Sequence, residues 1–138
     1  MEKERLIRAA LEARKHAYTP YSHFQVGAAL LTKGGTLYQG CNIENAAYTP
    51  TICAERNAFF KAVYEGEREF AAIAIAGSPE GDCVSYAAPC GVCRQVMMEF
   101  CDPQEFRILI AKSVEEYVEY SLEDMLPMGF GPENLQRG

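Results

Sequence analysis

Three cysteines and one glutamate stand in two short segments whose residue types and spacing suit metal binding and proton transfer. Cys53 and Glu55 belong to the segment CAE (53–55), and Cys90 and Cys93 belong to the segment PCGVC (89–93). Two cysteines separated by two residues can form a redox pair or supply two metal ligands. The pair alone leaves both interpretations open, so the choice depends on the rest of the chain.

Length and composition indicate a globular protein. The chain has 138 residues, of which 49% are hydrophobic and 23% charged, and this fits one domain over residues 1–138 with its own core. The N-terminal segment MEKERLIRAALEARKHAY is charged and helix-periodic, which argues against a signal peptide. No run of about 18 apolar residues offers a membrane span. We therefore expect a cytoplasmic protein without a membrane partner.

The net charge bears on whether the protein binds nucleic acid, and the number of cysteines bears on whether it binds a metal. Thirteen Lys and Arg against nineteen Asp and Glu give a formal charge of −6. This balance disfavours a nucleic-acid partner, because Lys and Arg contacts to phosphates supply most of that affinity. Six cysteines are many for a chain of this size. Without a secretion signal they indicate metal binding or catalysis rather than disulfides.

Hydrophobic periodicity predicts the elements that must position these residues. It predicts helices over 2–17, 53–66 and about 90–101, buried strands over 70–78 and 105–113, a β-hairpin with strands over 24–32 and 36–44, a short strand over 116–120 and a capped helical turn over 121–127. This order is typical of an α/β sandwich with a mixed sheet.

The predicted helices explain how the thiols meet. Cys53 begins one helix, and Cys90 and Cys93 begin the next. Two helices on the same face of a sheet can bring their N-termini together, where the helix dipoles favour thiolates. Three sulfur ligands with one open coordination position are typical of a catalytic rather than a structural zinc site.

Two other interpretations of the cysteines stay open at this point. A thioredoxin-like redox pair also begins a helix after a strand, but it leaves CAE unexplained, and the chain has no tryptophan. A structural four-cysteine site needs a fourth ligand, and none of the other cysteines has a partner at metal-ligand spacing. We interpret Cys41 as a buried small residue, Cys83 as a loop thiol and Cys101 as a core helix residue.

Glu55 favours the catalytic interpretation. Zinc deaminases combine a ligand, any residue and Glu with a later P-C-x-x-C, and here these elements are CAE and PCGVC. On an ideal helix Glu55 lies about 200° from Cys53. The two side chains can therefore share a site only if Cys53 is the helix cap. A capping-box glutamate is the alternative role for Glu55.

With these motifs, the chain resembles the small, homotetrameric, zinc-dependent cytidine deaminases of the cytidine/deoxycytidylate deaminase superfamily. The resemblance runs in order through nearly the whole chain, in YSHFQVGAAL (21–30), GCNIENAAY (40–48), CAERNA (53–58), PCGVCRQVMMEF (89–100) and LPMGFGPENLQ (126–136). It implies one cytidine deaminase domain, a three-layer sandwich whose central sheet has about five strands flanked by helices, and hydrolysis of cytidine and 2′-deoxycytidine to uridine and 2′-deoxyuridine in pyrimidine salvage.

The resemblance also implies roles for individual residues. Cys53, Cys90 and Cys93 would bind Zn²⁺ as the cofactor, Glu55 would be the general acid and base, and Arg56 would balance the charge of the thiolates. Arg94 is the second candidate for that last role.

The remaining predicted residues would hold a nucleoside. By resemblance, Asn42 and Glu44 bind the ribose 3′-hydroxyl, Phe24 stacks on the pyrimidine, Ala54 offers backbone groups to the base, and neighbouring subunits supply Ala46, Tyr48 and Phe130. A homotetramer with shared active sites follows from this last group. Glu44 would also repel a phosphate, which favours nucleosides over nucleotides.

Some residues depart from the family pattern. Ala88 stands where Ser or Thr is common, the loop before PCGVC is a few residues longer, and Asn57 stands where Thr is frequent. The nearest rival is a blasticidin-type or other small zinc deaminase, and a non-catalytic zinc-binding module is a rival of a different class.

Overall fold

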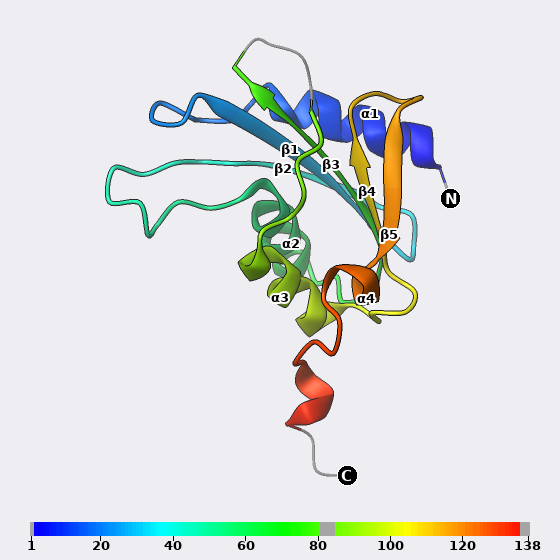
Figure 1. Cartoon of the computed structure of the whole chain (residues 1–138). Coiled ribbons are helices and arrows are strands. Elements are labelled where there is room, and N and C mark those ends of the chain that lie inside the picture. The colour runs from blue at the N-terminus through cyan, green and yellow to red at the C-terminus, as the bar shows by residue number, and fades with distance from the viewer. Residues whose placement is uncertain (1, 81–84, 136–138) are drawn as a thin grey trace.

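A five-stranded mixed sheet lies at the centre of the structure, a computed structural model that describes residues 2–80 and 85–135 (Figure 1). The strand order is β2-β1-β3-β4-β5; β3 and β4 are parallel, and the other neighbours are antiparallel. The strands are β1 (Phe24–Thr32), β2 (Leu37–Cys41), β3 (Phe70–Pro79), β4 (Arg107–Ala111) and β5 (Tyr117–Ser121). The helices are α1 (Lys3–Arg14), α2 (Ala54–Tyr64), α3 (Gly91–Phe100), α4 (Leu122–Met125) and a short 3₁₀ helix (Pro132–Asn134).

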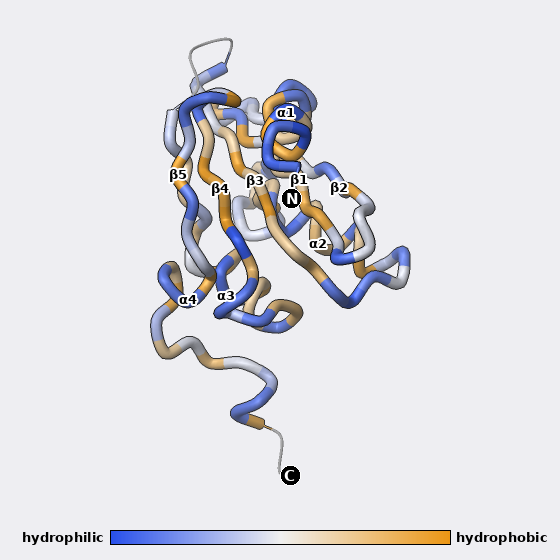
Figure 2. Tube along the Cα trace, turned by 90° about the vertical axis from the view of Figure 1, so that its right-hand side faces the viewer, coloured by the Kyte–Doolittle hydropathy of each residue, from blue (hydrophilic) through white to orange (hydrophobic). Residues whose placement is uncertain are grey.

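The helices cover both faces of this sheet, which confirms the predicted three-layer α/β sandwich. Helix α1 packs on one face, and α2 and α3 pack on the other (Figure 1). Along β3, Ile73 and Ile75 face α2 and α3, whereas the intervening alanines face α1. Hydrophobic residues are therefore concentrated in the inner strands, as Figure 2 shows. A strand covered on both faces needs this continuous apolar run.

Glycine at position 40 brings α2 close to the sheet. A Cβ at Gly40 would lie 2.4 Å from the Ala54 carbonyl oxygen and 2.6 Å from the Ala58 nitrogen. The Asn57 amide also donates to the Cys41 carbonyl at 3.1 Å. These contacts fix the first turn of α2, which carries the CAE motif, against β2.

The predicted elements are confirmed with shifted ends. The capped turn after β5 is present, because Ser121 and Asp124 each accept a hydrogen bond from the other's backbone N–H. The second hairpin strand was predicted to reach residue 44, which is wrong, since β2 ends at Cys41. Asn42 is still bound to β1, because its N–H donates to the Val26 carbonyl at 3.3 Å and its side chain bonds to the backbones of Val26 and Phe24. The physical reason for the end of β2 is the next residue, Ile43, which forms bridges with Tyr18 and Ile52 instead of with β1.

None of the helices within residues 2–80 and 85–135 has the length and apolar character needed to cross a bilayer.

Candidate active site

Two helix N-termini on the same face of the sheet carry the predicted metal ligands. Cys53 is the N-cap of α2 with extended backbone (φ −76°, ψ 156°), and Cys90 is the N-cap of α3 with similar angles. The condition set by the sequence is therefore met, because Cys53 precedes the helix and projects away from its cylinder. Cys93 follows in the first turn of α3 and is buried.

The three sulfur atoms are arranged as a metal site requires. The Sγ atoms of Cys53 and Cys90 lie 3.7 Å apart, those of Cys90 and Cys93 lie 3.5 Å apart, and all three fall within 4.8 Å of one another. Tetrahedral zinc with bonds of about 2.3 Å places sulfur ligands roughly 3.8 Å apart. The spacing and the donor set therefore fit zinc with its fourth position free.

Arg56 lies against the thiol cluster and supplies the positive charge expected there. Its Nη2 donates to the Cys53 sulfur at 3.3 Å. Hydrogen bonds from Cys93 and Arg56 lower the pKa of Cys53 to about 5, although burial opposes them. The same hydrogen bond raises the pKa of the Arg56 guanidinium. The pKa of Cys93 is raised, because its thiol donates a hydrogen bond to Cys53 and because it is buried.

Arg94 has a different part. Its guanidinium donates to the carbonyl oxygens of Pro89 and Met125, at 2.7 Å each. These bonds tie the segment before α3 to α4. Of the two arginines, Arg56 is the one that contacts the thiols.

Glu55 is a buried carboxyl beside the thiol cluster. It is the second residue of α2, and 4% of its surface is exposed. Burial raises its pKa to about 7, with a smaller contribution from the negative charge of Cys53. The capping-box alternative does not apply, because that box uses the third helical residue and α2 has no side-chain cap. A carboxyl with a pKa near neutrality suits a group that both accepts and donates protons.

A cavity of about 330 Å³ joins Glu55 to the predicted base-binding residues. Predicted residues among its lining are Phe24, Asn42, Cys53, Ala54, Glu55 and Cys90. The prediction missed Val26, Thr51, Ile52 and Ala87, which also line it and lie next to predicted residues in the sequence or on the same strand face. Ala88, noted for its departure from the family pattern, lines the cavity too.

Glu44 lies beside this cavity without lining it. Its carboxylate accepts hydrogen bonds from the backbone N–H groups of Tyr21 and Ser22 and from the Ser22 hydroxyl. These bonds, led by that of the hydroxyl, lower the pKa of Glu44. With Tyr48 it lines a neighbouring hollow of about 430 Å³, and Thr51 lines both spaces.

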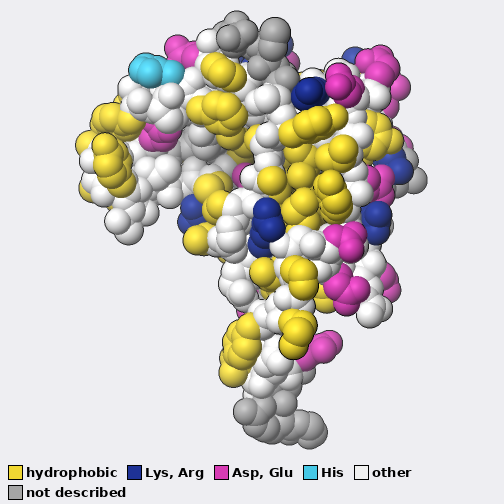
Figure 3. Space-filling model, in the orientation of Figure 1, with side chains coloured by type: hydrophobic (Ala, Val, Ile, Leu, Met, Phe, Trp, Pro, Cys, Tyr) yellow, Lys and Arg dark blue, Asp and Glu magenta, His cyan; other side chains and the backbone are white. Residues whose placement is uncertain are grey.

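The residues predicted to act across subunits lie away from the cavity within one chain. Tyr48 is 73% exposed and Phe130 is 56% exposed. Ala46 lies in a turn shortly before Tyr48, in the connection between β2 and α2. Phe130 belongs to the C-terminal segment, which leaves the body of the molecule (Figure 1) and carries exposed hydrophobic side chains (Figure 3).

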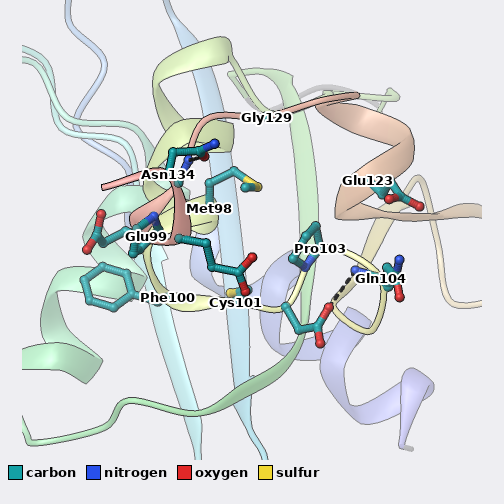
Figure 4. Close-up of a pocket in the computed structure, with 13 residues that line it drawn as sticks. Met98, Glu99, Phe100, Cys101, Pro103, Gln104, Glu123, Gly129 and Asn134 are labelled. Atoms are coloured by element: carbon teal, nitrogen blue, oxygen red, sulfur yellow. Dashed lines mark hydrogen bonds between the residues drawn. The ribbon is translucent and has the colours of Figure 1, made fainter. Parts of the chain in front are cut away.

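Of the cysteines that the structure describes, Cys41 and Cys101 take no part in the cluster. Cys101, predicted within the helix, is buried directly after the end of α3. Cys41 is only partly buried, so its prediction as a buried residue is wrong in degree. Cys83 lies outside the described residues. A larger hollow of about 790 Å³ between the end of α3 and the C-terminal segment contains none of the predicted site residues (Figure 4).

The fold and the site together define a zinc-binding deaminase domain, and comparison with known proteins identifies the family. Residues 1–108 match the cytidine and deoxycytidylate deaminase zinc-binding region. The chain therefore belongs to the cytidine and deoxycytidylate deaminase family, and zinc is the cofactor for which Cys53, Cys90 and Cys93 form the site.

Relatives match over nearly their full length. A cytidine deaminase of Sporosarcina psychrophila is 47% identical over 135 residues, which cover 98% of this chain and 96% of the relative. A crystal structure of cytidine deaminase from Burkholderia pseudomallei superposes with a TM-score of 0.84 at 45% identity, covering 94% of this chain and 100% of that one. That from Mycobacterium tuberculosis gives 0.78 at 35% identity, covering 95% and 98%.

Proposed function

We propose that this protein hydrolyses cytidine and 2′-deoxycytidine to uridine and 2′-deoxyuridine and releases ammonia. One observation carries the proposal: a buried carboxyl, Glu55, lies in a cavity beside three thiols spaced for zinc. A structural zinc site needs no such acid, whereas hydrolytic deamination needs a group that moves protons between water, ring and leaving amine.

The chain's own residues divide this chemistry between them. Zinc, when held by the three thiolates, supplies the Lewis acid that makes hydroxide available near neutral pH. Glu55 takes one proton of the attacking water and passes it to N3 of the pyrimidine, and then takes the other from the hydroxyl added at C4 and delivers it to the departing amino group, which leaves as ammonia. Arg56 offsets part of the negative charge of the thiolates through its bond to Cys53. In sum, water is consumed and the C4–N bond is replaced by a C4–O bond.

The same cavity suits a nucleoside. Phe24 offers a ring face for stacking on the base, and Ala54 offers backbone groups at the start of α2. Asn42 is held by its bonds to β1, which leaves one amide hydrogen and one lone pair for a sugar hydroxyl. Glu44 places a negative charge nearby, so we propose nucleosides rather than nucleotides as substrates, in the salvage of pyrimidines.

We further propose that the single domain works in the cytoplasm as a homotetramer whose sites are shared. The support is that Tyr48 and Phe130 are large and exposed and do not line the cavity of their own chain. Aromatic side chains of this kind are enriched in protein interfaces. A neighbouring copy would bury them and bring Ala46, Tyr48 and Phe130 to its cavity.

Ammonia release from cytidine, 2′-deoxycytidine and dCMP by the zinc-loaded protein tests the proposed reaction. We expect both nucleosides to be deaminated and dCMP to be a poorer substrate. Parallel assays of Glu55→Gln should show zinc content equal to the parent with little turnover. A folded, zinc-loaded parent that acts on blasticidin but not on cytidine would support the rival deaminase. A parent inactive on every substrate would support a binding module.

Mixing two inactive variants tests the shared sites. Glu55→Gln lacks the acid, and Phe130→Ala lacks the residue expected from the neighbour. If each cavity uses Phe130 of a neighbouring chain, dissociating the two variants and reassembling them together creates cavities that have both Glu55 and Phe130. The mixture should then regain activity that neither variant has alone. A fully active species with the mass of one chain in solution would refute the tetramer.

A further inference from the structure

Gly77 stands where three segments around the cavity meet. It lies near the end of β3 and pairs with Val26 of β1. On its other side it forms an isolated bridge with Ser85, whose N–H donates to the Gly77 carbonyl at 2.8 Å. Gly77 therefore joins the strand that carries Phe24 to the segment that carries Ala87.

The space of the missing Gly77 side chain is filled by two residues of the cavity wall. A Cβ at this position would lie 2.7 Å from the Ala87 Cβ, 3.0 Å from Phe24 Cε2 and 3.3 Å from Phe24 Cζ. The backbone at Gly77 does not adopt positive φ. Glycine is thus used here for close approach rather than for its conformation. The Phe24 ring and the Ala87 methyl both pack against the backbone of β3 at Gly77.

This packing controls how far both groups stand back from the cavity. Carbon atoms in contact prefer separations of about 3.5–4.0 Å. A methyl group at position 77 would therefore displace the Ala87 methyl from β3 by roughly 0.8 Å or more, and the Phe24 edge by roughly 0.5 Å. At Gly77 the backbone of β3 is held by β1 on one side and by the bridge to Ser85 on the other, so the direction left for the Phe24 ring and the Ala87 methyl is into the cavity.

We infer that Gly77 is a positioning residue for substrate binding: by carrying no side chain, it lets the Phe24 ring and the Ala87 methyl lie back against β3, and so it sets how far both groups protrude into the cavity that receives the base. The inference rests on the proposed function, because it takes the occupant of the cavity to be a pyrimidine nucleoside. Gly77 touches no reacting atom, and it acts only through the two side chains that cover it.

Substitution Gly77→Ala tests the inference directly. The zinc-loaded variant should bind uridine, the reaction product, about 10-fold more weakly by calorimetry and show a KM for cytidine raised to the same extent. Its zinc stoichiometry and the pH dependence of kcat should equal those of the parent. A merely structural role would lower thermal stability but leave the affinity of the folded protein unchanged.

A matched control and a compensating variant sharpen the test. Gly34→Ala adds the same methyl group where the nearest atom is 3.8 Å away, and it should leave uridine binding unchanged. The double variant Gly77→Ala/Ala87→Gly removes the 2.7 Å contact, so it should recover part of the lost affinity. If Gly77→Ala fails to fold, Ala87→Val adds volume to the same cavity wall from the loop side and should also weaken uridine binding.

The outcomes separate this inference from the proposed function. A folded, zinc-loaded parent that releases no ammonia from cytidine refutes the proposed function. An active parent with unchanged uridine affinity in Gly77→Ala, or in Ala87→Val where Gly77→Ala does not fold, refutes the inference alone. Equal losses in Gly77→Ala and the double variant refute it as well.

Discussion

Replacing Glu55 by glutamine should stabilise the zinc-free protein at neutral pH, and the size of the effect follows from burial. Glutamine has nearly the same shape but carries no charge. Burial raises the pKa of Glu55 from 4.5 to about 7, and each pKa unit corresponds to about 1.4 kcal/mol. Ionised Glu55 therefore destabilises the folded chain by about 3 kcal/mol relative to the unfolded chain.

The sign of the pH dependence follows from proton counts. Below pH 4.5 the carboxyl is protonated in both states and has no effect on the free energy of unfolding. Between pH 4.5 and about 7 the folded chain binds more protons than the unfolded chain, so its stability falls as the pH rises. The difference between Glu55→Gln and the parent should grow from near zero at pH 4.5 to about 3 kcal/mol at pH 8.

Urea unfolding of both proteins in excess chelator, followed by circular dichroism between pH 4.5 and 8, measures this difference. Using the difference removes that part of the thiol titration that does not depend on the charge of Glu55. Glu99→Gln, an exposed glutamate of α3, serves as the matched control and should show no such trend. Parallel stability curves for Glu55→Gln and the parent would mean that solvent reaches Glu55 and would refute the argument from burial.

The zinc-loaded form of the same variant tests catalysis. General acid and base groups contribute about 10²–10⁴-fold to rates, so turnover should fall within that range while zinc content is retained. Turnover equal to that of the parent would exclude Glu55 as the proton carrier.

Three further substitutions probe the support of the site. Cys90→Ala leaves two thiols, and zinc measured by atomic emission should fall far below one ion per chain, with a lower melting temperature. Asn42→Ala removes two hydrogen bonds to the backbone of β1 and should lower the free energy of unfolding by about 2 kcal/mol in urea titration, with KM raised more than kcat is reduced. Gly40→Ala forces a methyl to within 2.4 Å of the Ala54 carbonyl, so it should destabilise the fold by about 1–3 kcal/mol and weaken zinc retention against a chelator. Unchanged zinc retention in folded Gly40→Ala would show that the first turn of α2 is not held by this contact.

The residues proposed to do the chemistry could be identified because they are local in sequence. Cys53 and Glu55 belong to one motif, and Cys90 and Cys93 belong to another. Each motif lies at the start of a helix that the apolar periodicity of the sequence predicts. When both helices lie on the same face of the sheet, their N-termini can come together there, as those of α2 and α3 do. The three layers were equally predictable, since β3 is apolar on both faces and so has to be covered on both.

Contacts between distant segments were not predictable from the pattern. The hairpin periodicity placed Asn42 and Glu44 together on one strand face. In the structure Asn42 bonds to β1 and Glu44 bonds to Ser22, and they line adjacent but different spaces. An alternating pattern shows where a strand is suited, but it does not show which distant segments the backbone will pair with beyond its end, as Ile43 pairs with Tyr18 and Ile52.

The sequence by itself thus predicted the metal ligands, the proposed acid and the layered fold, because local spacing and periodicity carry that information. Only the tertiary structure decided how closely the elements approach. Gly40 admits α2 to the sheet, and Gly77 admits the ring of Phe24. The sequence does not show which residues pack against a glycine in a strand. The atoms that fill the space of its missing side chain come from residues far away along the chain and meet it only in the folded protein.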